Sequence, residues 1–129
     1  MTTAGLSQYQ TVNSFGQLDG ASPYRVTQLM LDTLATRIAE AEGHVARSET
    51  EAKGIKIAKA IGLVEGLVMS LDIEQGGEIA RNLQDLYDYL LRGLVEANLD
   101  NSVAKLREIG GIVAEIKAGW DGIGAEAGA

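Results

Sequence analysis

The 129-residue chain contains no cysteine, a single proline, a single histidine and few aromatic residues. Without cysteine it can form neither a disulfide framework nor a thiolate metal site. Its most apolar stretch, from Ile55 to Leu71, is interrupted by Lys56, Lys59 and Glu65. Because a membrane helix needs about 20 mostly apolar residues, we predict no membrane insertion.

Positive charge is also scarce. Eighteen acidic residues against eleven basic ones give a formal net charge of −7 and a pI near 4.6. Nucleic-acid binding depends on clustered lysine and arginine, so the composition argues against a nucleic-acid partner. The first twenty residues carry no basic run and no continuous apolar segment, so we expect no secretory signal peptide.

Apolar residues recur at intervals of three and four, which predicts helices rather than strands. The first helix is expected over 22–46, with Ser22 as its N-cap and Pro23 at its first position. The second is expected over 49–71, behind a capping box formed by Ser48 and Glu51. The expected core positions of these two helices are Val26, Met30, Leu34, Ile38, Ala41, Val45, Ile57, Ile61, Val64, Val68 and Leu71.

Two more helices are expected after a turn at Gly76-Gly77. One spans about 77–98, where Asn98 suits a left-handed C-terminal position. The other spans about 101–120 and is capped by Asp100 or Asn101. Its expected core positions are Val103, Leu106, Ile109, Val113, Ile116 and Trp120.

Four helices of similar length joined by short loops predict an all-α protein, an antiparallel four-helix bundle. The bundle is expected over 22–122. Residues 1–21 are expected to form a polar N-terminal arm with scattered apolar residues, and 123–129 a flexible Ala/Gly tail.

The helix over 77–98 is apolar on two faces. One stripe, which we assign to the core, repeats with a helical period, and a second lies about 100° further round. A small bundle needs only one apolar face per helix, so the second stripe indicates burial on both sides or a surface for a partner. The first stripe is Ile79, Leu83, Leu86, Leu90 and Ala97; the second is Tyr87, Leu91 and Val95.

The helix over 49–71 carries small residues at intervals of four: Gly54, Ala58, Gly62 and Gly66. This column fits close helix packing and equally a shallow groove that a partner backbone can approach. Leu63 and Leu67 of the same helix lie off its core face.

The sequence offers few residues that could act in catalysis or bind a metal. His44 could indicate a histidine phosphotransfer domain, which is also a small helical bundle, but it is expected near a helix end, where a solvated histidine is the simpler interpretation. A di-metal bundle site needs two Glu-x-x-His motifs, which one histidine cannot supply, and no nucleophile motif is present. We therefore predict no enzyme, no cofactor and no metal.

Residues 70–98 also resemble a known family. Ser70-Leu71-Asp72, Gly76-Gly77-Glu78 and Glu96-Ala97-Asn98 are similar in order and spacing to the signature of the flagellar export chaperone family FliS. The resemblance covers roughly residues 5–122. Its further elements are Ala21-Ser22-Pro23, Gly66-Leu67, Leu83, Leu86-Tyr87, Tyr89 and Trp120.

The resemblance implies a cytoplasmic, non-enzymatic bundle that holds the disordered C-terminal segment of flagellin, blocks its premature polymerisation and helps deliver it for secretion. The flagellar export gate is a further candidate partner. The resemblance also favours an N-terminal arm that covers the flagellin-binding surface over an arm that is disordered. A generic helical adaptor, and behind it a phosphotransfer domain, are the alternatives. The predicted partner-binding residues are Leu6, Tyr9, Leu63, Leu67, Tyr87, Leu91 and Val95.

Overall fold

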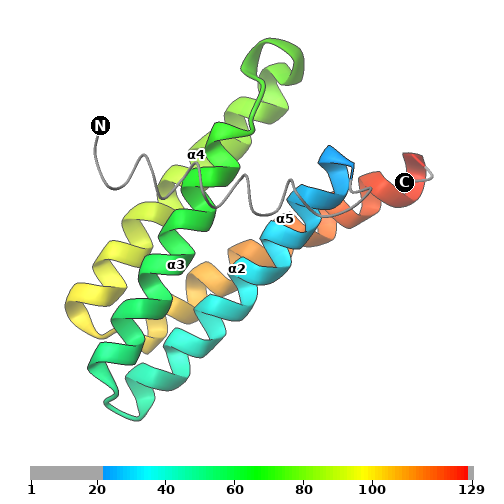
Figure 1. Ribbon diagram of the computed structural model, residues 1–129. Coiled ribbons are helices and arrows are strands. Elements are labelled where there is room, and N and C mark those ends of the chain that lie inside the picture. Colours follow the sequence, from blue (N-terminus) through cyan, green and yellow to red (C-terminus); the bar gives the residue numbers. More distant parts are fainter. Residues whose placement is uncertain (1–21, 128–129) are drawn as a thin grey trace.

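A computed structural model describes residues 22–127, with side chains as far as Ile123. This part of the chain consists of four helices and contains no strand (Figure 1). The prediction of an all-α four-helix bundle is confirmed. The helices are α2 (Pro23–Ala46), α3 (Thr50–Met69), α4 (Ile73–Asp100) and α5 (Val103–Ala127).

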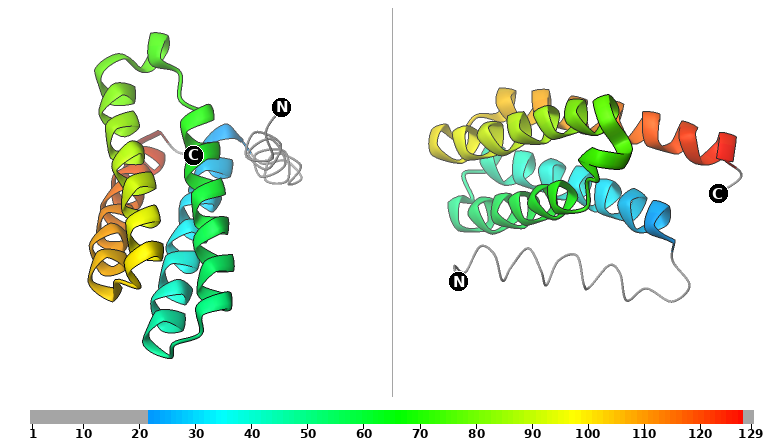
Figure 2. Two further views of the ribbon diagram at one scale, coloured as in Figure 1. Left: turned by 90° about the vertical axis from the view of Figure 1, so that its left-hand side faces the viewer. Right: turned by 90° about the horizontal axis from the view of Figure 1, so that it is seen from above.

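Each helix packs against two others, so the four form a closed ring in the order α2, α3, α4, α5. Short turns connect successive helices, which therefore run antiparallel (Figure 2). The predicted core face of α2 is confirmed, with Met30, Leu34, Ile38 and Ala41 buried. The largest fully buried side chains of the other helices are Ile57, Val64, Leu67, Leu90, Leu94, Leu106, Ile109 and Val113.

The helix starts follow the predicted caps at one of three places. Ser22 caps α2, since its Oγ accepts a hydrogen bond from Arg25 N at 3.1 Å, and Pro23 follows it. The predicted capping box at Ser48 and Glu51 is wrong. Ser48 has a left-handed φ of 59°, and α3 starts after Glu49 with no side-chain cap.

The cap predicted for the last helix is also wrong. Ser102 performs that role, with its Oγ accepting from Lys105 N at 3.0 Å. Asn101 instead ends α4 in the left-handed region, at φ 51° and ψ 46°. Asn98, predicted for that position, is still helical. Asparagine tolerates this conformation better than most residues, so the residue type was inferred correctly but its position was not.

The start of α4 differs from the expected turn at Gly76-Gly77. Asp72 accepts a hydrogen bond from Gln75 N at 3.0 Å and caps an additional first turn from Ile73. Gly77 then interrupts the helix with φ 54° and ψ −127°, a conformation that needs glycine. The helical segment after this kink carries the two apolar stripes.

Lys53 joins α3 to the end of α4. Although charged, its side chain is only 5% exposed. Its Nζ donates to Asn98 O at 3.0 Å and to Asn101 Oδ1 at 2.7 Å. A lysine that binds the last carbonyls of a helix satisfies acceptors that the helix itself leaves free. We call this end of the bundle, with the α2–α3 and α4–α5 turns, the closed end.

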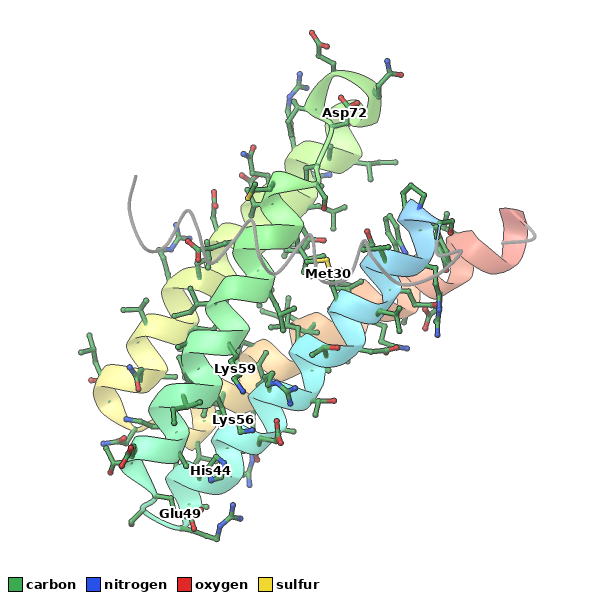
Figure 3. All side chains as sticks on the ribbon, viewed as in Figure 1. Met30, His44, Glu49, Lys56, Lys59 and Asp72 are labelled. Carbon is green, nitrogen blue, oxygen red and sulfur yellow. The ribbon has the colours of Figure 1, made fainter. Side chains whose placement is uncertain are left out.

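The opposite end is open. In Figure 1 the upper parts of α3 and α4 separate from the start of α2 and the end of α5, and Figure 2 shows the same divergence from the side. Asp72 marks the tip of the α3–α4 pair there, whereas His44 and Glu49 lie at the closed end (Figure 3). Apolar positions near the open end therefore lose their cross-bundle partners.

We predict that Lys53→Met lowers the free energy of unfolding by about 1–3 kcal/mol, because Asn98 O and Asn101 Oδ1 would lose a charged donor in a partly buried place. Urea unfolding followed by circular dichroism measures this. The matched control is Lys59→Met, at an exposed position of the same helix, which should change stability by less than about 0.5 kcal/mol. Equal effects of the two substitutions would contradict a stabilising role for Lys53.

Candidate partner-binding surfaces

An apolar groove of about 340 Å³ runs between α4 and α5 at the open end. We call it the α4–α5 groove. Glu115 is its one charged lining residue; the others are apolar apart from a glycine. The lining residues are Ile79, Leu83, Leu86, Ile112, Glu115, Ile116, Gly119, Trp120 and Ile123.

Three of these side chains are unusually exposed for large hydrophobic residues. Ile79 is 70% exposed, Ile123 52% and Leu86 39%. Single exposed apolar residues are ordinary, but a contiguous apolar patch marks an interaction site. The groove is thus a preformed apolar surface of the kind that accepts a partner segment.

Trp120 forms the far wall of the groove and is fixed by Tyr24 of α2. The two rings stack with centroids 5.2 Å apart and an interplanar angle of 9°. Their hydrogen bonds are reciprocal: Tyr24 Oη donates to Trp120 O at 2.7 Å, and Trp120 Nε1 donates to Tyr24 O at 3.1 Å. Both polar atoms of the pair are therefore satisfied, and the start of α2 positions the end of α5.

A polar cluster beside Trp120 strengthens the same link. Gln28 Nε2 donates to Asp121 Oδ1 at 2.7 Å, and Lys117 Nζ donates to Asp121 Oδ2 at 2.8 Å. These bonds, that from Gln28 first, lower the pKa of Asp121. Lys117 also lies 3.2 Å from Asp32 Oδ1, and hydrogen bonds to the two carboxylates raise its pKa. Lys117 offsets part of the charge of the two carboxylates. None of these residues lines the groove, whose one charged lining residue is Glu115.

The predicted core stripe of α4 is only partly correct. Leu90 and Ala97 are buried, and Leu83 packs against the core. Ile79 and Leu86, however, are exposed in the groove, because α4 extends past the level at which α5 still packs closely against it. The helical spacing of the stripe was predicted correctly, but the predicted burial of Ile79 and Leu86 is wrong.

The second stripe is divided between core and surface. Tyr87 is 2% exposed and belongs to the core cluster, so the structure does not place it on an open surface. Its position between Ala80 and Leu94, each seven residues away, puts it on the buried face. Leu91 is half-buried and Val95 is 49% exposed.

Beside Leu91 and Val95 lies Leu99, which is 77% exposed. These three residues, which we call the α4 outer strip, line a surface hollow of about 440 Å³ together with Arg92, Glu96 and Asp100. Sequence analysis missed Leu99, although its spacing of four from Val95 continues the stripe.

The remaining predicted partner-binding residues are not on an exposed surface of the described structure. Leu63 and Leu67 are buried in the core cluster, so our prediction that they lie off the core face of α3 is wrong. Leu6 and Tyr9, with the rest of the expected arm, lie outside the described residues. Ile112 and Ile123, which line the groove, were not identified from the sequence, because α5 was assigned a single apolar face and an end near 120.

His44 lies near the end of α2, as predicted, and its Nδ1 is 2.9 Å from Glu49 Oε1. Arg47 Nε donates to the same oxygen at 2.8 Å. The pKa of Glu49 is lowered, first by the hydrogen bond with His44 and then by that with Arg47. Within residues 22–127, no group of three or more histidine, cysteine, aspartate or glutamate residues is arranged to hold a metal.

Comparison with known proteins agrees with the resemblance. The family model described as "Flagellar protein FliS" matches residues 5–127. The chain belongs to the FliS family. It is 44% identical to a flagellar secretion chaperone FliSB of Pseudomonas aeruginosa, over 92% of this chain and 94% of that one. It is 34% identical to a flagellar secretion chaperone FliS of Salmonella typhimurium, over 98% and 94% of the two chains.

A third relative is the flagellar secretion chaperone FliS of Vibrio cholerae, 31% identical over 92% of this chain and 87% of its own. The relatives are named as chaperones of flagellar secretion, so this FliS-family member is a flagellar export chaperone. In the described part of the chain, none of the helices combines the length and apolarity needed to cross a membrane.

We predict that Tyr24→Phe lowers the free energy of unfolding by about 0.5–1.5 kcal/mol, the usual contribution of one hydrogen bond. The ring stack remains, but Trp120 O loses its donor. Because Trp120 is the single tryptophan, its fluorescence should shift to longer wavelength as the end of α5 loosens. Tyr89→Phe, which removes an exposed hydrogen bond to Glu108, should leave the emission unchanged; an equal shift would contradict the link.

Burial raises the pKa of Tyr87 to about 12. An unfolded tyrosine ionises near pH 10, so between pH 10 and 12 the unfolded state binds fewer protons than the folded state. The free energy of unfolding should therefore fall with rising pH, by up to about 1.4 kcal/mol per pH unit from this group. Urea unfolding at several pH values should show a shallower fall in Tyr87→Phe, and an unchanged fall would contradict burial of the hydroxyl.

Proposed function

We propose that this FliS-family protein binds the disordered C-terminal segment of flagellin in the cytoplasm. Binding would keep the segment from polymerising prematurely and help deliver it to the flagellar export apparatus, without enzymatic chemistry. The observation that carries the proposal is the α4–α5 groove, an exposed apolar channel on a member of a flagellar secretion chaperone family.

The groove suits a client that becomes helical on binding. An amphipathic helix presents apolar anchors at i, i+3, i+4 and i+7, and two diverging helices offer a channel for them. Ile79 and Ile123 stand at the rim and Ile116 lies deeper. Ordering a disordered segment costs entropy, which burial of these already exposed side chains would offset.

Of the residues predicted for partner binding, Leu91 and Val95 are accessible and remain partner-binding candidates, but they lie outside the α4–α5 groove. Leu63, Leu67 and Tyr87 are buried, so their direct contact with a client would need the bundle to rearrange. The arm residues Leu6 and Tyr9 remain a proposal from the family resemblance.

A phosphotransfer domain presents its histidine on a solvated face in the middle of a helix. The His44 side chain is instead 19% exposed, near the end of α2, and its Nδ1 contacts the carboxylate of Glu49. The generic adaptor stays as the alternative, and it differs from the proposed function in the identity of the client.

The proposal predicts that Leu86→Ala and Ile123→Ala each weaken binding of a synthetic flagellin C-terminal peptide by roughly ten- to hundredfold. Stability should change little, because both side chains are already partly in water. Isothermal titration calorimetry measures the affinity, and thermal unfolding checks the fold.

The matched control is Ile55→Ala on α3, an exposed isoleucine outside the groove (48% exposed). It should leave the affinity unchanged. If the wild-type protein does not bind the flagellin peptide, the generic adaptor is preferred. If it binds but Leu86→Ala and Ile123→Ala bind equally well, the groove is not the site.

A further inference from the structure

The α4 outer strip is a second exposed apolar surface, and the proposed client site in the α4–α5 groove does not include it. Leu91, Val95 and Leu99 are spaced by four residues, so they form one continuous ridge over about two helical turns. Exposure increases along it, from the half-buried Leu91 to Leu99 near the end of the helix.

The strip and the groove face opposite directions. Val95 follows Leu86 by nine residues, and at about 100° per residue this amounts to two and a half turns of helix. The two side chains therefore point to opposite sides of α4. A single straight helix cannot cover both surfaces, so each can hold a ligand of its own.

The two surfaces also differ in charge. The groove is lined by a single charged residue, Glu115. The strip lies on a helix with six acidic and two basic side chains, and Glu96 and Asp100 line its hollow beside Arg92. Asp88, seven residues before Val95, is exposed on the same face.

The three carboxylates of this rim, those of Asp88, Glu96 and Asp100, outnumber the one guanidinium that lines the hollow, that of Arg92. Glu96 has one partner, Lys105 Nζ at 3.6 Å. Among the ion pairs formed within residues 22–127, none includes Asp88 or Asp100. An apolar ridge with free carboxylates along its sides is complementary to a positively charged partner.

The strip is preformed. It occupies the closed end, where Lys53 holds the last turn of α4 through Asn98 and Asn101. A ligand would thus bind a rigid surface and lose little free energy to ordering the chaperone.

We propose that the α4 outer strip binds an amphipathic helix of a protein partner whose apolar stripe is flanked by lysine or arginine. The partner's apolar side chains would cover Val95 and Leu99, and its basic side chains would lie against Asp88, Glu96 and Asp100. This site is separate from the groove, so the chaperone can hold a client and this partner together.

The test uses a synthetic amphipathic helix of about 18 residues with leucine on one face and lysine on the other, titrated into the full chain. A scrambled peptide of the same composition controls for non-specific charge attraction. We expect the amphipathic peptide to bind at least tenfold more tightly than the scrambled one. Equal affinities would overturn the proposal.

Two variants locate the site. Val95→Ser/Leu99→Ser should weaken peptide binding at least tenfold, whereas Ile79→Ser/Ile123→Ser in the groove should leave it unchanged. All four side chains are exposed, and circular dichroism confirms that each variant folds. A loss confined to the groove variant would show that the peptide binds there instead and would overturn the assignment.

Charge is tested separately with Asp88→Asn/Asp100→Asn. Neutralising these two carboxylates should weaken binding of the basic peptide. It should also reduce the salt dependence of the affinity, because fewer ion pairs remain to be screened. A peptide with glutamate in place of lysine should bind worse than the basic peptide. If neither the variant nor the glutamate peptide changes the affinity, the strip does not recognise a basic helix and the contact is purely apolar.

Discussion

Helix α4 is longer than the core that it shares with its neighbours, and the exposed groove at the open end follows from that constraint. At about 1.5 Å per residue, the 28 residues of α4 would span about 42 Å if straight. Its buried large side chains, Tyr87, Leu90 and Leu94, lie in the second half of this length. Towards the open end the apolar periodicity continues at Ile79 and Leu86, which no partner helix covers. The α4 outer strip has another origin, because it lies on the opposite face of the helix.

The two ends of the bundle differ in how the helices are held together. At the closed end Lys53 donates to the Asn98 carbonyl of α4 and to the side chain of its C-cap, Asn101, which joins α3 to the end of α4 beside the outer strip. At the open end the Tyr24–Trp120 pair joins α2 to α5, while α4 diverges from them. The groove is therefore bounded by one fixed wall and one separated helix, an arrangement suited to accepting a segment that the free protein lacks.

Much of the fold could be predicted from sequence because the helical period and the start of α2 are local signals. Ser22 and Pro23 were read correctly, as was the core face through Met30 and Leu34. The caps at Ser48 and Asp100 or Asn101 were wrong because several capping residues stand close together there. Local chemistry does not decide between them, whereas the geometry of the turn does.

The candidate site was less predictable for a different reason. Periodicity assigns residues to faces, but whether a face is covered depends on how far the neighbouring helix extends beside it. Ile79 and Leu86 share a face with Leu90, yet only Leu90 is buried, and no pattern within α4 indicates where α5 diverges. The prediction that Tyr87 binds a partner at the surface fails for a related reason. Two apolar stripes on one helix do not show which of them faces the core.

The most direct test of the account is methyl NMR of the protein labelled at isoleucine, recorded during titration with the flagellin C-terminal peptide. The account predicts large shift changes at Ile79, Ile116 and Ile123 of the groove. Ile38 and Ile57, which are buried in the core, should change little. Shifts confined to isoleucines outside the groove, such as Ile55, would contradict the claim that the open end of the bundle receives the client.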